Sequence, residues 1–154
     1  MGVSPVELLN LSNHFRSYAE DENLAENVRE VFLRECISVA YYGCYHLALE
    51  LATSRGYKRP QGWGSHEALW VAWYTSDLET QELGVAGKSL HSLRCDASYR
   101  LQQTLHLNVE GAMGMRDDIL ELLKSEMERV SNLPPELTER DWNRKDYAKQ
   151  TVVA

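Results

Sequence analysis

The sequence has no apolar run of the roughly 18 to 20 residues that a transmembrane helix requires, although 44% of its residues are hydrophobic. Its first ten residues, MGVSPVELLN, contain no basic region followed by an apolar run, which argues against a secretory signal peptide. Together the two absences predict a cytoplasmic protein that does not associate with a membrane.

Cysteine is scarce, and the 3 cysteines, Cys36, Cys44 and Cys95, show no paired metal-ligand spacing. An odd number of this kind predicts reduced thiols rather than a disulfide framework or a zinc site. A glycine-rich phosphate loop before a helix and a nucleophile elbow are missing as well. Glutamates such as Glu121 and Glu126 lack the Glu-x-x-His companions of a di-iron bundle. We therefore expect neither a metal nor a cofactor.

Positive charge is also in short supply, since the net charge of the chain is −7 at pH 7. This balance argues against nonspecific binding of nucleic acid over a broad phosphate footprint. The densest short basic cluster before the C-terminal tail is Arg55, Lys58 and Arg59. A local basic site is one explanation, but a solvated helix end whose cations complement the helix dipole is favoured.

Runs of β-branched residues and convincing two-residue alternation are absent, whereas apolar residues recur at helical spacing. We predict an all-α antiparallel bundle of four or five helices, with no internal repeat. The first helix should start at the capping box of Ser4, Pro5 and Glu7. The expected helices span residues 4–20, 24–55, 65–77, 89–107 and 115–130, separated by loops at 56–64 and 81–87 and by a soft junction at 108–114.

The second expected helix is long enough that a kink or break is predicted within it. A single bundle domain should cover residues 1–132, followed by a charged C-terminal arm at 133–154. Within the long helix, the stretch 33–46, LRECISVAYYGCYH, carries Arg34, Ser38, Tyr42 and His46 at four-residue intervals. They share one helix face, where polar groups need partners or a functional contact.

Residues 33–48 resemble the LR-x-x-x-S-x-A-YY-x-x-FH-x-A helix of the small HEPN-domain family. Three further segments follow in the expected order: 66–69 resembles that family's TH-x-x-L, 90–99 resembles its L-x-x-L-R-x-x-A-D-Y, and 109–112 resembles the small-residue start of its last helix. The resemblance covers about residues 24–130. It implies a HEPN-like bundle that forms a side-by-side homodimer. Active members of this family cut RNA without a metal.

In those active members, an arginine and a histidine four to six residues apart meet their dimer mates in a cleft. A histidine can move the protons of the reaction, and an arginine can stabilise charge on the phosphate. At the family's arginine position, Arg94 is followed five residues later by Tyr99 rather than by histidine. Arg100 and His106, with five intervening residues, match the spacing and are predicted to be the catalytic pair.

The remaining cleft residues are predicted to bind the substrate: Arg94, Tyr99, His46, Tyr42 and Arg34. Several alternatives stay open. Arg94 could instead pair with Asp96 or with tyrosine hydroxyls and join two helices. Arg59 and His66 have a similar spacing, with six intervening residues, but first-turn structure beside Ser65 also explains His66. His14 and His91 are predicted to be surface or packing residues.

These observations lead to two functional hypotheses. The first is a homodimeric, metal-independent endoribonuclease of a toxin or defence system, with RNA as substrate and an antitoxin or defence-complex protein as partner. The second is a non-catalytic HEPN-type binding or assembly subunit for a protein or nucleotide partner. The charge of −7 and the tyrosine at position 99 favour the second hypothesis.

Overall fold

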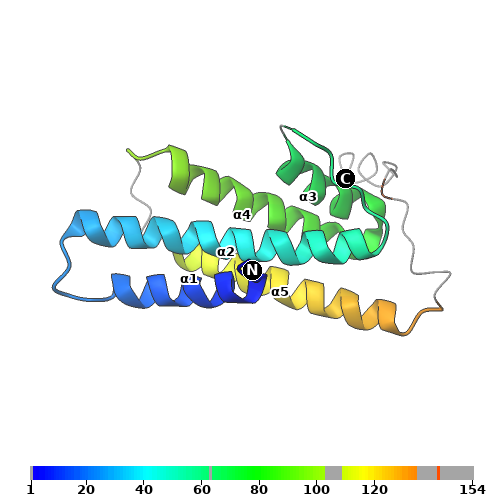
Figure 1. The fold of residues 1–154 in the computed structure, drawn as a ribbon, viewed down its shortest axis with the longest axis horizontal. Coiled ribbons are helices and arrows are strands. Elements are labelled where there is room, and N and C mark those ends of the chain that lie inside the picture. The colour runs from blue at the N-terminus through cyan, green and yellow to red at the C-terminus, as the bar shows by residue number, and fades with distance from the viewer. Residues whose placement is uncertain (1, 63, 103–108, 135–141, 143–154) are drawn as a thin grey trace.

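The computed structural model describes residues 2–62, 64–102, 109–134 and 142, and every regular element in that part of the chain is a helix. The all-α bundle predicted from the sequence is therefore confirmed (Figure 1). The elements are α1 (Pro5–Ala19), α2 (Glu26–Ser54), α3 (Ser65–Ser76), the 3-10 turn η1 (Leu78–Thr80), α4 (Gln81–Tyr99) and α5 (Val109–Ser131).

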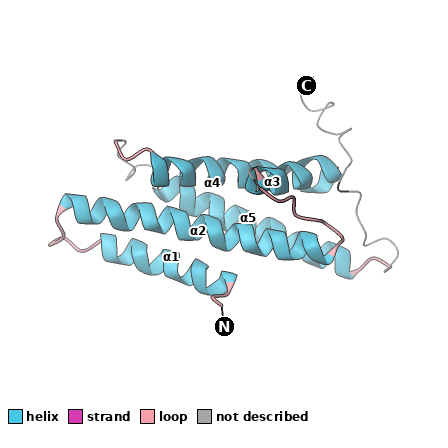
Figure 2. Ribbon diagram, turned by 45° about the horizontal axis from the view of Figure 1, so that its top comes forward, coloured by secondary structure: helices cyan, strands magenta, loops and turns pink. Residues whose placement is uncertain are grey.

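Helix α2 is the centre of the bundle and contacts each of the other four α-helices (Figures 1 and 2). It runs from Glu26 to Ser54 without the predicted break. Small buried residues such as Ala40, Cys44 and Ala48 let its neighbours approach closely. The polar stripe of residues 33–46 therefore lies on the central helix. Arg34 is buried there, and Ser38, Tyr42 and His46 are half-buried, so their polar groups need partners.

Helix α1 begins as the sequence predicts. The Ser4 hydroxyl accepts a hydrogen bond from the Glu7 backbone N–H, and the Glu7 carboxylate accepts one from the Ser4 N–H. Pro5 occupies the first helical position, where its missing N–H costs nothing. The capping box is thus confirmed in both directions.

Three of the predicted boundaries are wrong. Residues 81–87 were expected to form a loop, but α4 already begins at Gln81, directly after η1. Residues 108–114 were expected to be a junction, but α5 begins at Val109. Both segments are rich in glycine, which disfavours helix by about 1 kcal/mol per residue, and tertiary packing outweighs that local preference. Helix α4 also ends at Tyr99, earlier than the expected 107.

Helix α3 crosses α4 at two glycines in the first turns of α4. A Cβ atom at Gly87 would lie 2.0 Å from Cε3 of Trp70, and one at Gly84 would lie 2.6 Å from the backbone oxygen of Trp70. Trp70 is fully buried, so its ring cannot move away into solvent. The glycines that resembled a loop in the sequence are therefore the contact that brings α3 against α4.

Replacing Gly87 with alanine is expected to destabilise the protein by about 2 kcal/mol, because the clash with Trp70 exceeds the gain in helix propensity. Urea denaturation followed by circular dichroism measures the change. Gly114→Ala in α5 is the matched control, because a Cβ there meets nothing within 4 Å. That variant should be as stable as the wild type or more so, and equal effects of the two substitutions would contradict a tight crossing.

The three cysteines are free, and two of them are core residues. Burial raises the pKa of the Cys36 thiol to about 11 and that of the Cys44 thiol to about 12. Both thiols are therefore protonated at neutral pH and act as small apolar groups in the core. Cys95 differs from them because it is only half-buried.

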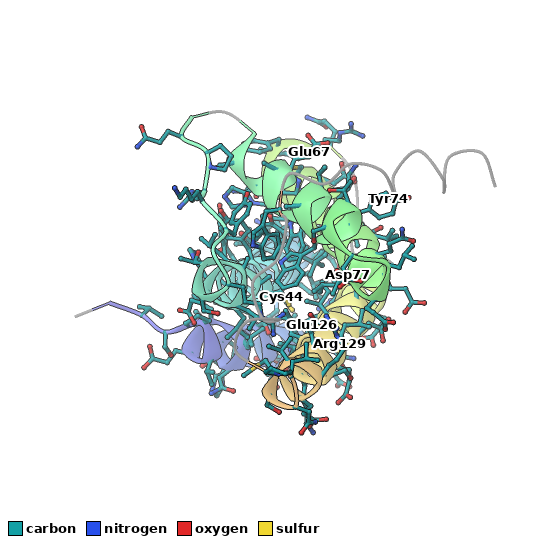
Figure 3. All side chains as sticks on the ribbon, turned by 90° about the vertical axis from the view of Figure 1, so that its right-hand side faces the viewer. Cys44, Glu67, Tyr74, Asp77, Glu126 and Arg129 are labelled. Carbon is teal, nitrogen blue, oxygen red and sulfur yellow. The ribbon has the colours of Figure 1, made fainter. Side chains whose placement is uncertain are left out.

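A buried ion pair joins the end of α2 to α5. Arg55 donates to a Glu126 carboxylate oxygen at 2.7 Å, and both side chains are nearly inaccessible to solvent. Arg129 also binds this carboxylate at 2.7 Å and reaches Asp77 at 3.4 Å, and Figure 3 shows Asp77, Glu126 and Arg129 lying together. The basic cluster of Arg55, Lys58 and Arg59 was expected at a solvated helix end. Arg55 is buried instead and points into the bundle.

One residue of the predicted C-terminal arm contacts the same end of the bundle. The Trp142 indole N–H donates to the backbone oxygen of Arg55 at 3.0 Å. Its ring packs edge-on against Tyr57 and Trp73, with ring centroids 5.3 and 5.0 Å away. The rest of the arm after Pro134 lies outside the described residues. Within the described chain, no helix combines the length and the apolar character needed to span a membrane.

Candidate functional site

The first turn of α3, the loop before it and the C-terminal half of α4 surround a pocket of about 490 Å³. The loop bends at Gly62 and Gly64, both of which have positive φ angles that favour glycine. The pocket is lined by Gly62, Gly64, Ser65, His66, Glu67, His91, Arg94, Cys95 and Tyr99. Its ionisable side chains include two histidines, one arginine, one cysteine and one glutamate, and this glutamate pairs with Lys88 at 3.7 Å.

The two histidine rings lie parallel to each other. The His66 and His91 ring centroids are 5.7 Å apart with an interplanar angle of 15°. His66 also stacks on Tyr45, whose ring centroid is 3.9 Å away. The His91 ring lies 5.2 Å from that of Tyr41. Tyrosines of α2 thus form an aromatic floor that fixes the orientation of both imidazoles.

A chain of hydrogen bonds selects the tautomer of His66. The Trp70 indole N–H donates to the Tyr41 hydroxyl at 3.1 Å, and this hydroxyl lies 2.8 Å from Nδ1 of His66. An indole N–H can only donate, so the hydroxyl oxygen accepts there and its single proton is available for Nδ1. Nδ1 is then the acceptor, and Nε2 of the neutral imidazole carries the proton.

Three histidines near the pocket are held neutral. Burial lowers the pKa of His66 to about 4, and the nearby charges of His91 and Arg94 act in the same direction. Burial and then Arg94 lower the pKa of His91, and burial and then Arg59 lower that of His46. At neutral pH these rings therefore present a lone pair and an N–H rather than a positive charge.

Arg94 supplies the positive charge beside these neutral rings. Its guanidinium donates to the Tyr42 hydroxyl and lies over the rings of Tyr42 and Tyr99, 4.9 and 5.5 Å from their centroids. Its Nε is buried and has no hydrogen-bond partner among the described residues. A fixed cation at the wall of the pocket is suited to binding an anion there.

Cys95 lies one helical turn after His91. Its Sγ is 3.6 Å from His91 Nε2, close enough for a weak hydrogen bond between thiol and imidazole. An arriving group with a stronger donor, such as a hydroxyl, can displace this bond at low cost. With the His91 proton on Nδ1, Nε2 accepts from the thiol and is the proton acceptor in the pocket.

Four of the predicted substrate-binding residues lie together. Arg94 and Tyr99 line the pocket, Tyr42 holds the Arg94 guanidinium, and His46 stacks on Tyr42 at 6.4 Å between ring centroids. Tyr99 is 71% exposed, so its ring is open to solvent. Of the two explanations left open for Arg94, the contact with a tyrosine hydroxyl is present.

Arg34 lies elsewhere. Its buried guanidinium donates to the backbone oxygens of Ala97 at 2.8 Å and of Leu101 at 3.3 Å, and it forms an ion pair with Glu30 at 3.3 Å. These bonds satisfy carbonyls at the C-terminal end of α4, which have no partner within the helix. Arg34 therefore stabilises the end of α4 and does not line the histidine pocket.

The structure describes only Arg100 of the predicted catalytic pair. Arg100 follows the last residue of α4, is exposed, and forms an ion pair with Asp96 at 3.3 Å. His106 lies outside the described residues. Sequence reasoning placed His91 on the surface or in packing, and it left His66 open. The spacing of His91, Arg94 and Cys95 on one helix face would have pointed to the pocket.

The low pKa of His66 predicts a loss of stability in mild acid. Between about pH 6.5 and pH 4 the unfolded chain binds a proton at His66 that the folded protein does not, so stability falls as pH falls through this window. The expected loss is about 2 kcal/mol. Urea denaturation at pH 7 and pH 4.5 measures it, and His66→Asn should remove most of this pH dependence. The exposed His14→Asn should keep it, and identical curves for both variants would contradict the prediction.

Within the described residues, no cluster of three or more histidine, cysteine, aspartate or glutamate side chains is arranged to hold a metal ion. Comparison with protein-family models, curated proteins and solved structures finds no match to this chain.

Proposed function

We propose that the pocket formed by His66, His91 and Arg94 binds a phosphodiester of RNA and cleaves it without a metal ion. The observation that carries this proposal is the meeting of two neutral imidazoles with one fixed guanidinium in a single pocket. The resemblance of residues 24–130 to the HEPN family supports the same chemistry. In this proposal Arg94 replaces Arg100, whose side chain is exposed and paired with Asp96.

Each of the three residues has a role that follows from its contacts. Arg94 binds the phosphate and stabilises the charge that develops on it. His91 Nε2 accepts the proton of the ribose 2′-hydroxyl, whose oxygen then attacks phosphorus. His66 donates its Nε2 proton in a hydrogen bond to a phosphate oxygen, because Tyr41 occupies its Nδ1. The 5′-oxygen leaves and takes a proton from water.

The exposed Tyr99 ring gives this site a surface for a nucleobase. It lies beside Arg94 at the pocket wall, and a base can stack on it while Arg94 holds the adjacent phosphate. Stacking of this kind tolerates any base, so we expect cleavage of single-stranded RNA with little sequence preference.

Incubation of the purified protein with total RNA in the presence of EDTA tests the proposal. Wild type should cleave, and His91→Asn should cleave at least 10²-fold more slowly, because asparagine keeps polarity but cannot act as a general base. His14→Asn is the matched control and should retain full activity. The same residual cleavage in all three proteins would reveal a contaminating nuclease and overturn the assignment.

A second candidate function is non-catalytic binding, in which the pocket holds a nucleotide or a phosphorylated partner protein. The charge of −7 and the engagement of His66 by Tyr41 and of His91 by Cys95 favour it. Titration with a 2′-O-methyl oligonucleotide, which lacks the attacking hydroxyl, separates the two functions. Binding that depends on Arg94, without cleavage of the unmodified RNA, would favour this second function.

The resemblance further suggests a homodimer, and an antitoxin or defence-complex protein as partner. A side-by-side dimer would bring two copies of the pocket near one RNA strand. Sedimentation equilibrium of the purified chain tests the dimer directly, and a mass equal to that of one chain at assay concentration would exclude it from the mechanism.

A further inference from the structure

A second hollow lies on a different part of the bundle. The end of α3, the first turns of α4 and the middle of α5 form a groove of about 610 Å³. It is lined by Tyr74, Gln81, Glu82, Val85, Ala86, Asp118, Glu121 and Leu122. No residue lines both this groove and the histidine pocket. Figure 3 shows Tyr74 at the outer edge of the bundle.

The floor of the groove is apolar and partly open to water. Val85 is 51% exposed although it lines the groove. Ala86 and Leu122 are half-buried beside it. A large apolar side chain placed on Val85 and Leu122 would bury surface that the isolated chain leaves hydrated, which favours binding.

Three exposed carboxylates surround this floor. Glu82 precedes Val85 and Ala86 by three and four residues on α4, and on α5 Asp118 lies one turn before Leu122. Glu121 also lines the groove. None of the three carboxylates forms an ion pair within the described chain. By contrast, the adjacent Asp117 pairs with Arg116 at 2.9 Å. The groove thus combines an apolar floor with uncompensated negative charge.

We propose that this groove binds a basic amphipathic helix of a partner protein. One apolar side chain of that helix would lie on Val85 and Leu122, with Lys or Arg residues on either side facing Glu82, Asp118 and Glu121. Helices bind grooves in this way through apolar anchors at positions i, i+3 or i+4. The lined stretches of α4 and α5 each cover less than two helical turns, so about two turns of the partner are engaged.

The charge of the rim argues against other macromolecules. RNA and anionic lipid surfaces both carry negative charge, which three neighbouring carboxylates repel. The charge of the groove therefore favours a cationic protein segment. This proposal does not depend on whether the histidine pocket cleaves RNA.

Fluorescence anisotropy with a labelled synthetic peptide of about four turns tests the proposal. The probe carries Leu at i, i+4 and i+7 and Lys at the flanking positions, and a scrambled peptide of the same composition is its control. Wild type should bind the amphipathic peptide with a Kd in the micromolar range, at least tenfold more tightly than the scrambled peptide. Added salt should weaken the binding, since it screens exposed charges.

Charge reversal locates the site. Glu82→Lys combined with Glu121→Lys should raise the Kd at least tenfold, whereas the control Glu128→Lys, on an exposed part of α5 outside the groove, should change it less than twofold. Circular dichroism confirms that both proteins fold. Equal binding of the scrambled peptide, no loss on charge reversal, or no binding up to millimolar peptide would each overturn the proposal. Tighter binding of a labelled RNA at this groove would do so as well.

Discussion

Replacement of Arg94 with methionine is expected to reduce the rate of RNA cleavage by about 10³-fold. Methionine keeps much of the side-chain volume but removes the guanidinium that lies over the rings of Tyr42 and Tyr99. That group is the charged donor beside the two neutral imidazoles, and its Nε has no partner in the described chain. Single-turnover cleavage of a labelled RNA strand measures the effect.

Two companion variants make the result specific. Arg100→Met removes a cation close by in the sequence, but its ion pair with Asp96 is exposed, so activity should change less than threefold. Arg94→Lys keeps the charge without the planar fork and should recover only part of the rate. Loss of activity in Arg100→Met with full activity in Arg94→Met would return the catalytic role to Arg100 and His106.

Disruption of the Arg55–Glu126 pair is expected to have the largest effect on stability. Glu126→Gln should lower the free energy of unfolding by about 3 to 5 kcal/mol, because it leaves the buried Arg55 guanidinium without its carboxylate. Arg55→Met should cost less, because Arg129 still binds Glu126 at 2.7 Å. The two side chains are only 6% and 4% exposed. Urea denaturation of the single variants at pH 7 measures the loss.

The double variant Arg55→Met/Glu126→Leu separates the cost of an unpaired charge from the value of the pair. It should be more stable than Glu126→Gln alone, because no buried guanidinium is left at position 55 without a carboxylate. Lys88→Met, which breaks the exposed contact with Glu67 at 3.7 Å, is the surface control and should cost less than 1 kcal/mol. A Glu126→Gln variant as mild as this control would show that water reaches Arg55 and compensates its charge.

Part of the candidate site could be predicted because it depends on spacing within helices. Tyr42 and His46 lie one turn apart on α2, so their stacking follows from helical geometry alone. The pairing of Arg94 with a tyrosine was one of two alternatives for that residue, and the structure has it with Tyr42. His66 and His91 could not be brought together in this way, because they belong to different helices.

Their meeting depends on how α3 crosses α4. The crossing is possible because Gly84 and Gly87 leave room for Trp70, and in the sequence the same glycines indicated a loop. Trp70 in turn donates to Tyr41, which orients His66. A local pattern could not reveal this chain of contacts, since each step joins residues distant in the sequence.

The sequence by itself determined the helical class, the capped start of α1 and the absence of a long apolar span, because capping and periodicity act over a few residues. Only the tertiary structure decided which charged groups are inside. Arg34 lies in α2 and Arg55 directly follows its last residue, yet Arg55 neutralises Glu126 and Arg34 binds carbonyls at the end of α4. Burial of a charge depends on the neighbours that the fold supplies, and those neighbours come from other helices.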